Sequence, residues 1–242
     1  MLLNLVLMSF IVGSVGTGAG AVLALPFAKR GDGRFLYGFS SGFMLCVVMF
    51  DMIPSASQIS DMYTGILGVF LGAMFVFVFN RILDRIYIIR RENGTIKTGL
   101  LLFIAIALHN FPEGVAIGAG YELELSFAIF ISVVMALHNI PEGMAMGISL
   151  YLGGETRLKI LGYGLIAGLP TIFGALIGNL AANIGQRFIG GGLGFAAGAM
   201  LYVCLSELIP QGKSAAGRKF YISFGVGLMF GQIVLILCEN LI

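Results

Sequence analysis

Eight apolar runs follow one another along the chain, each close to or above the roughly 20 residues that an α-helix needs to cross a bilayer. Hydrophobic residues make up 58% of the chain and charged residues 11%, with a mean hydropathy of +0.99, whereas soluble domains carry about a quarter charged residues. A soluble globular domain is therefore excluded, and an all-α integral membrane protein with eight transmembrane helices is predicted. The predicted helices span Leu2–Leu25, Leu36–Ser57, Tyr63–Leu83, Thr98–Tyr121, Ser126–Leu150, Ile160–Asn183, Gly191–Gln211 and Phe220–Leu241.

The basic residues gather in the loops on one side of these helices. Thirteen of the 14 Lys and Arg residues follow the first, third, fifth and seventh helices, and only Arg187 falls on the opposite side. By the positive-inside rule the thirteen are predicted to be cytoplasmic, which puts both termini on the extracytoplasmic side of the cell or inner membrane. Residues 1–242 are predicted to form a single transmembrane domain, with the lipid bilayer as a partner and no nucleic acid.

A repeat links the second and seventh helices. Gly38–Pro54 aligns with Gly194–Pro210, eight of the seventeen positions are identical, and Asp51 falls opposite Glu207. Because the two helices run in opposite directions, the pattern predicts an inverted repeat of helices 1–3 and 6–8, as in many secondary transporters. The alternative is that two glycine-rich membrane helices resemble each other by composition alone.

A second duplication lies in the middle of the fourth and fifth helices. Ala107–Gly114 and Ala136–Gly143 share the pattern Ala-Leu-His-Asn-x-Pro-Glu-Gly and contain the only two histidines of the chain. In a helix, His and the Glu four residues later lie on one face. Two such helices facing each other would supply imidazole, carboxylate and amide groups suited to a divalent transition metal. The candidate metal ligands are His109, Asn110, Glu113, His138, Asn139 and Glu142.

Ionisable groups within apolar helices are expensive, and a functional role is the default interpretation. Asp51 lies toward the outer end of its helix and Glu207 toward the inner end, with the duplicated motif between them. This line of acids predicts a cation pathway, and two close carboxylates predict that metal binding displaces a proton. The alternatives are a buried neutral histidine, acids that only bond to a neighbouring helix, and asparagines that only join helices.

At these residues the chain resembles the ZIP (Zrt/Irt-like protein) family of divalent metal transporters, most closely its GufA-type branch. The resemblance implies a 3+2+3 bundle that is usually a homodimer and imports Zn²⁺, Fe²⁺, Mn²⁺, Cd²⁺ or Co²⁺ by alternating access. It implies a first metal site at His109, Glu113, His138 and Glu142, and an adjoining second site at Asn110 and Asn139 with the same glutamates. Asp51 and Glu207 would serve the routes into and out of the site, with Ser206 at a position that is often a polar ligand.

One position departs from the family pattern. GufA-type members typically carry Glu-Pro shortly before Gly-Ala-Leu, whereas this chain reads Gly168-Leu169-Pro170-Thr171 before Gly174. Thr171 falls where the acid would be, so the second site lacks a charged ligand. We expect one tightly bound metal and at most one weakly bound metal.

Two other functions fit parts of the pattern. A membrane-embedded zinc hydrolase would also use His and Glu, but a zincin needs His-Glu-x-x-His, and Asn follows His in both motifs here. A metal-cation channel would use Glu113 and Glu142 as its filter. The duplication favours a transporter that is not an enzyme, with the divalent metal as cargo and no catalytic cofactor.

Overall fold

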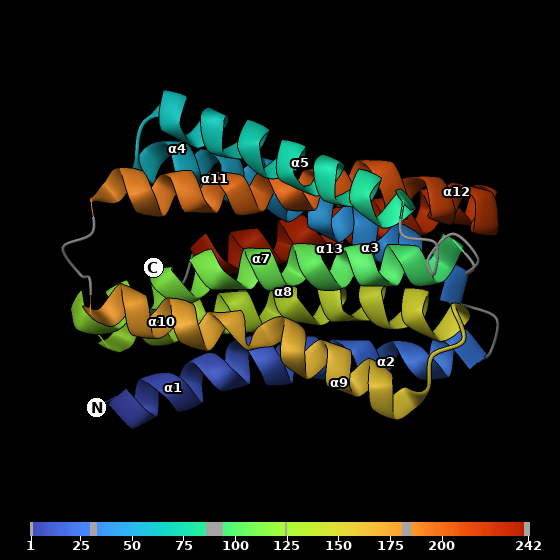
Figure 1. The fold of residues 1–242 in the computed structure, drawn as a ribbon, viewed down its shortest axis with the longest axis horizontal. Coiled ribbons are helices and arrows are strands. Elements are labelled where there is room, and N and C mark those ends of the chain that lie inside the picture. Colours follow the sequence, from blue (N-terminus) through green and yellow to red (C-terminus); the bar gives the residue numbers. More distant parts are fainter. Residues whose placement is uncertain (1, 30–32, 86–93, 124, 181–184, 240–242) are drawn as a thin grey trace.

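The computed structural model describes residues 2–29, 33–85, 94–123, 125–180 and 185–239, and all elements in these ranges are helical. They form eight helical stretches (Figure 1). In chain order these are α1 (Leu2–Phe10), η1 (Ile11–Val15) and α2 (Gly16–Lys29); α3 (Gly33–Val47), η2 (Val48–Met52) and α4 (Ile53–Ile59); α5 (Met62–Arg85); α7 (Gly94–Leu123); α8 (Leu125–Leu152); α9 (Arg157–Gly168) and α10 (Pro170–Leu180); α11 (Gln186–Val203), η3 (Cys204–Leu208) and α12 (Ile209–Ala216); and α13 (Arg218–Glu239). The predicted all-helical fold is confirmed.

Seven of the eight stretches contain described segments long and apolar enough to cross a membrane, and only described residues enter that comparison. The remaining stretch is α8, in which several side chains lie outside the described residues. Several helices are longer than predicted: the first reaches Lys29 and the fourth starts at Gly94. A count of apolar residues stops at the first polar residue, whereas backbone hydrogen bonding continues beyond it. The predicted ends at Asn183 and Leu241 lie outside the described residues.

Proline positions explain the irregularities of the second, sixth and seventh stretches. The sixth stretch, predicted as one helix, is interrupted at Leu169, because Pro170 has no N–H with which to continue the ladder. In the second and seventh stretches, π-helical segments precede Pro54 and Pro210. The wider π-turn accommodates the missing hydrogen bond. Asp51 and Glu207 lie within these π-segments, so both acids lie where the backbone departs from the α-helix.

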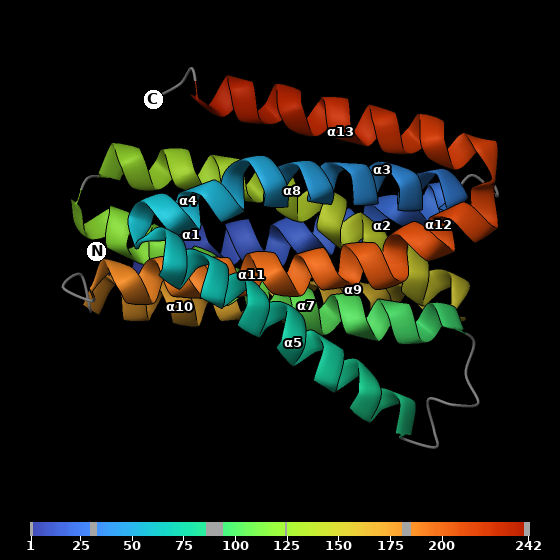
Figure 2. The same cartoon turned by 90° about the horizontal axis from the view of Figure 1, so that it is seen from above.

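The helices carrying the duplicated motif, α7 and α8, pack side by side in the middle of the bundle (Figures 1 and 2). On one side α2 packs along α8, and α10 packs along α7. On the other side α3 pairs with α13, and α11 pairs with α5. The motif is therefore enclosed by neighbouring helices, and α5 and α13 lie at the margins (Figure 2).

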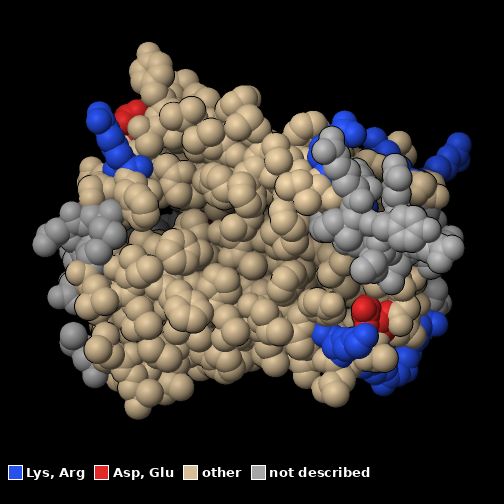
Figure 3. Space-filling view, viewed as in Figure 1, with Lys and Arg blue, Asp and Glu red and all other residues tan. Residues whose placement is uncertain are grey.

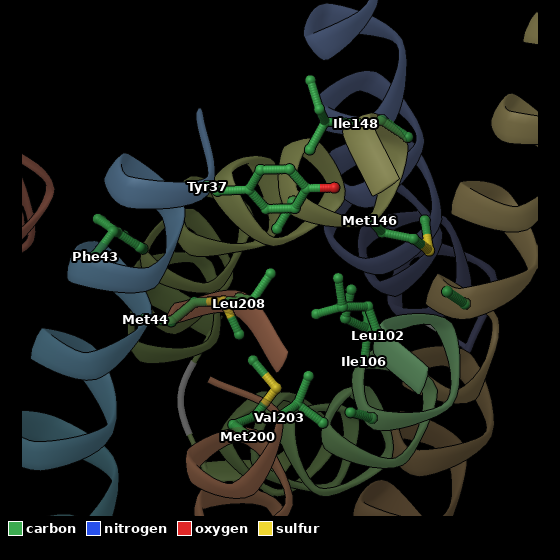
Figure 4. Packing of buried hydrophobic residues seen from close by; sticks show 14 of the residues in the cluster. Tyr37, Phe43, Met44, Leu102, Ile106, Met146, Ile148, Met200, Val203 and Leu208 are labelled. Carbon is green, nitrogen blue, oxygen red and sulfur yellow. The ribbon is translucent and has the colours of Figure 1, made fainter. Parts of the chain in front are cut away.

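An apolar core fills the space between α3, α7, α8 and α11 (Figure 4). The cluster has members in all eight helical stretches, and those named below come from α3, α7, α8 and α11 and are at most 1% exposed. They lie on the side of the duplicated motif that leads toward the start of α7 and the end of α8. Prominent members are Met44, Leu102, Ile106, Met146, Met200 and Val203.

The charged side chains gather at the two ends of the bundle, and the surface between them shows no charged side chain in this view (Figure 3). One end carries most of the Lys and Arg in this view; it is where α2, α5, α8 and α12 finish and α7, α9 and α13 begin (Figure 1). We call this the basic end. The alternation of helix directions agrees with a multi-pass membrane protein.

Candidate metal site

Three of the predicted ligands meet in the middle of the bundle. Nε2 of His109 lies 2.6 Å from Oε1 of Glu113 on the same helix. The same nitrogen lies 3.6 Å from Oε1 of Glu142, which α8 brings across from the second copy of the motif. The three residues are at most 3% exposed. The duplication thus places one imidazole between two buried carboxylates.

The short distance between His109 and Glu113 has a chemical consequence. The 2.6 Å separation of Nε2 and Oε1 is the length of a charge-assisted contact, so the pair is suited to sharing a proton. Among the described residues, no group of three or more His, Cys, Asp or Glu side chains is arranged so that it could hold a metal ion without rearrangement. The described part of the site is a buried cluster of one imidazole and two carboxylates.

The amide nitrogen of each motif asparagine donates a hydrogen bond to the backbone of a neighbouring helical stretch. Nδ2 of Asn110 donates to the carbonyl of Ala167 in α9 at 2.9 Å, and Nδ2 of Asn139 donates to the carbonyl of Val12 in η1 at 3.1 Å. Both side chains are fully buried. Neither Oδ1 has a hydrogen-bond partner among the described residues. The amide nitrogens therefore hold the sixth and first stretches against the motif, while both amide oxygens keep lone pairs for a cation.

His138 and Asp51 complete the neighbourhood of the cluster. His138 lies on α8, and its side chain is outside the described residues. Asp51, in η2, is half-buried and accepts a hydrogen bond from Oγ of Ser55 at 3.2 Å. Its charge also acts on His109. Asp51 thus lies within electrostatic reach of the cluster.

Glu207 sits in a polar network near the basic end. Its Oε1 accepts from Nδ2 of Asn80 in α5 at 3.3 Å, and its Oε2 accepts from Oγ1 of Thr98 in α7 at 2.9 Å. Asn80 also donates to the hydroxyl of Tyr202 at 3.1 Å, and Gln211 donates to Thr98. Sequence reasoning missed these partners. The signal for Asn80 was a lone amide within the apolar third run.

Ser206 and Thr171 lie in different settings. Ser206 is exposed, and its hydroxyl donates to the carbonyl of Tyr202 on its own helix at 2.7 Å. Thr171 is fully buried, and its hydroxyl has no hydrogen-bond partner among the described residues. A side chain added at Gly13 of η1 would collide with that hydroxyl. Thr171 therefore fills the crossing between the first and sixth stretches.

An exposed charge pair closes the turn at the end opposite the basic end. The backbone N–H and the hydroxyl of Thr64 each donate to Asp61 at 2.9 Å, and Nε of Arg187 lies 3.2 Å from the same carboxylate. The pKa of the Asp61 carboxyl is held below its usual range. The largest cause is the hydrogen bond from the backbone N–H of Thr64, followed by the Thr64 hydroxyl and the Arg187 guanidinium. Because the pair is exposed, its contribution to stability is small.

The comparisons with known proteins agree on one family. The family model of the ZIP zinc transporters matches residues 90–238, which include both copies of the motif. Zinc transporter GufA of Myxococcus xanthus is 34% identical over 181 residues, covering 71% of this chain and 68% of that protein. Zinc transporter ZupT of Streptococcus mutans is 32% identical over 248 residues, covering 92% and 93%. Zinc transporter ZupT of Chlorobium phaeovibrioides is 30% identical over 253 residues, covering 94% of each chain. The chain belongs to the ZIP family of zinc transporters.

Proposed function

We propose that this protein carries Zn²⁺ across the membrane by alternating access, with the cluster of His109, Glu113 and Glu142 as its binding site. The observation that carries the proposal is the burial of two carboxylates and an imidazole at the centre of an eight-helix bundle. Fe²⁺, Mn²⁺, Cd²⁺ and Co²⁺ fit the same ligands. Since ZIP proteins are transporters and not enzymes, the hydrolase alternative is set aside.

Charge balance supports a divalent cargo. An isolated divalent ion in hydrocarbon costs on the order of tens of kcal/mol, whereas ionised Glu113 and Glu142 together cancel its charge. The free amide oxygens of Asn110 and Asn139 add neutral ligands on the same two helices. We assign His138 to this site from the duplicated motif alone. Asp51 and Glu207 are assigned to the outer and inner routes, with Ser206 beside the inner route.

We expect zinc entering the site to release a proton held by the buried cluster of His109, Glu113 and Glu142, because two close carboxylates disfavour joint ionisation. Zn²⁺ needs the lone pairs of both atoms, so a proton shared by this pair has to leave before Nε2 and Oε1 can bind the metal. Zinc uptake into vesicles should therefore drive protons the opposite way, and a pH-sensitive dye would report the movement. Uptake that is independent of pH and moves no protons would contradict this expectation.

We expect one tightly held zinc ion per chain at this site. Thr171 supplies no charge, and its hydroxyl lies against Gly13, so the second site has only neutral ligands of its own. Elemental analysis of protein equilibrated with zinc and then washed should give about one ion per chain above the level of a Glu113→Ala, Glu142→Ala double variant. Two ions retained at full occupancy would contradict it.

The packing favours a carrier over a channel. Met44, Ile106, Met146 and Met200 fill the space between α3, α7, α8 and α11 (Figure 4). Release toward the basic end therefore requires these helices to separate and the bonds from Asn80 and Thr98 to Glu207 to rearrange. Saturable zinc flux would agree with a carrier, and single-channel currents would favour the channel.

The helix pairings support the inverted repeat. If helices 1–3 exchange with 6–8 and helix 4 exchanges with 5, the pairing of α2 with α8 becomes that of α10 with α7. The pairing of α3 with α13 likewise becomes that of α11 with α5. The aligned residues Gly42 and Gly198 also have matching roles, because a side chain there would collide with the carbonyl of Phe224 or of Val69. We infer a 3+2+3 arrangement of one transport domain over residues 1–242.

We also infer that the basic end is cytoplasmic, which puts both termini outside. The homodimer implied by the family resemblance remains a prediction. Cysteine-labelling with a membrane-impermeant reagent in intact cells would locate the termini, and light scattering of purified protein would give the number of chains.

The proposal as a whole is tested by zinc uptake into proteoliposomes. Purified protein should give saturable accumulation of radioactive zinc, and protein-free vesicles should give none. Equal accumulation in both kinds of vesicle would refute transport. Competition by Fe²⁺, Mn²⁺, Cd²⁺ and Co²⁺ would rank the cargoes.

A further inference from the structure

A groove of about 520 Å³ opens between the basic ends of α2 and α9, away from the metal site. The two helices pack against each other along the face of the bundle (Figure 1). Val22, Leu158 and Leu161 contribute its apolar wall, and Lys29 and Arg157 contribute its only charged groups among the described residues. The groove therefore combines an apolar surface with two cationic side chains.

The shape of the groove follows from the sequence of the two helices. A Cβ atom added at Gly164 would lie 2.7 Å from Cα of Gly18, so the helix backbones touch at this level. Toward the basic end, larger side chains such as Val22 and Leu161 replace these glycines. The helices are held apart there, and the space between their ends remains open.

Among the described residues, no acidic side chain forms an ion pair with either cation of the groove. Lys29 lies in the last turn of α2 and Arg157 starts α9, and neither forms an ion pair with a described residue. The acid nearest to Arg157 in the sequence, Glu155, is paired with Lys159 at 3.0 Å, and the acid nearest to Lys29, Asp32, lies outside the described residues. Leu158, beside Arg157, is 80% exposed although it is a large apolar side chain. In the part of the chain that the structure describes, the groove thus presents two unpaired cations next to exposed apolar surface.

We propose that this groove binds an anionic phospholipid, with the headgroup phosphate between Lys29 and Arg157 and an acyl chain along Val22 and Leu158. Basic pockets between transmembrane helices at the cytoplasmic side suit such headgroups. Charge complementarity selects an anionic lipid over a zwitterionic one, and the apolar wall selects a lipid over a free phosphate. The site does not depend on the transport proposal, because binding is measured without zinc.

The absence of tryptophan from the chain gives a clean test. A Leu158→Trp variant carries a single tryptophan in the groove, and brominated lipids quench its fluorescence on contact. Brominated phosphatidylglycerol should quench it at lower mole fraction than brominated phosphatidylcholine. Each cation near the surface contributes about fivefold to the affinity for an anionic lipid. Adding Lys29→Gln and Arg157→Gln should therefore bring the ratio of the two association constants close to one.

The matched control removes two cations of the same basic end that lie outside the groove. Leu158→Trp combined with Lys213→Gln and Arg218→Gln should keep the preference for phosphatidylglycerol. Circular dichroism and gel filtration would show that each variant is folded. Equal quenching by both lipids, or equal loss of preference in both charge variants, would overturn the proposal. Loss of the preference on adding excess inorganic phosphate would also overturn it, in favour of a free-phosphate site.

Discussion

Replacing Glu113 or Glu142 with Gln is expected to lower zinc uptake at least about 100-fold. Even the loss of a residue that only hydrogen-bonds to a metal ligand lowers metal affinity or activity by about 10–100-fold. Each substitution keeps the size of the side chain but leaves Zn²⁺ with one carboxylate, so a net positive charge remains in a buried site. The loss should appear as weaker zinc binding as well as slower uptake, measured by calorimetry on purified protein and by radioactive zinc in proteoliposomes.

Glu155→Gln is the matched control for this prediction. It removes a glutamate that pairs with exposed Lys159 at the basic end. Glu155 follows the end of α8 at Leu152, far from the cluster. Uptake by this variant should equal that of the unmodified chain. Normal zinc binding by folded Glu113→Gln and Glu142→Gln proteins would show that the cluster is not the site.

Gly143→Ala is expected to destabilise the protein by about 1–3 kcal/mol, the usual range for overpacking a well-packed interior. An added Cβ atom would lie 2.9 Å from the backbone nitrogen of Ala21 and 3.0 Å from the backbone carbon of Thr17. Backbone atoms cannot rotate away, so α2 must move off α8. For a chain of this size the midpoint of thermal unfolding should fall by roughly 5 °C.

Gly162→Ala provides the comparison, because an added Cβ atom there meets nothing within 4 Å. This variant should match or slightly exceed the unmodified protein in stability, since alanine favours the helix. Gly143→Ala should also reduce zinc uptake, because Glu142 lies next to the displaced contact. Equal unfolding midpoints for the two variants would mean that α2 and α8 are not packed as described.

Much of the fold follows from the sequence because the membrane restricts the choices. Apolar runs of bilayer length must be helices, and the His109–Glu113 contact follows from the four-residue spacing within one helix. The interruption at Leu169 was not predicted, although its signal is local, since Gly168 and Pro170 flank it. The membership of the ZIP family rests on motifs that are contiguous in the chain.

Contacts between distant segments were not accessible in the same way. The carbonyls of Val12 and Ala167 that hold the two asparagines are backbone groups, and any residue could supply them. The bonds from Asn80 and Thr98 to Glu207 depend on how three helices pack, which no periodicity within one run reveals. The contact of Thr171 with Gly13 likewise requires the crossing of two helices to be known.

The most direct test of the central claim is the position of zinc in crystals of the protein, found by anomalous scattering at the zinc absorption edge. We predict a peak in the middle of the bundle, about 2.0–2.1 Å from Nε2 of His109 and about 2.0–2.2 Å from carboxylate oxygens of Glu113 and Glu142. Zinc bound only at the ends of the bundle, with the bond between His109 and Glu113 intact, would contradict the account.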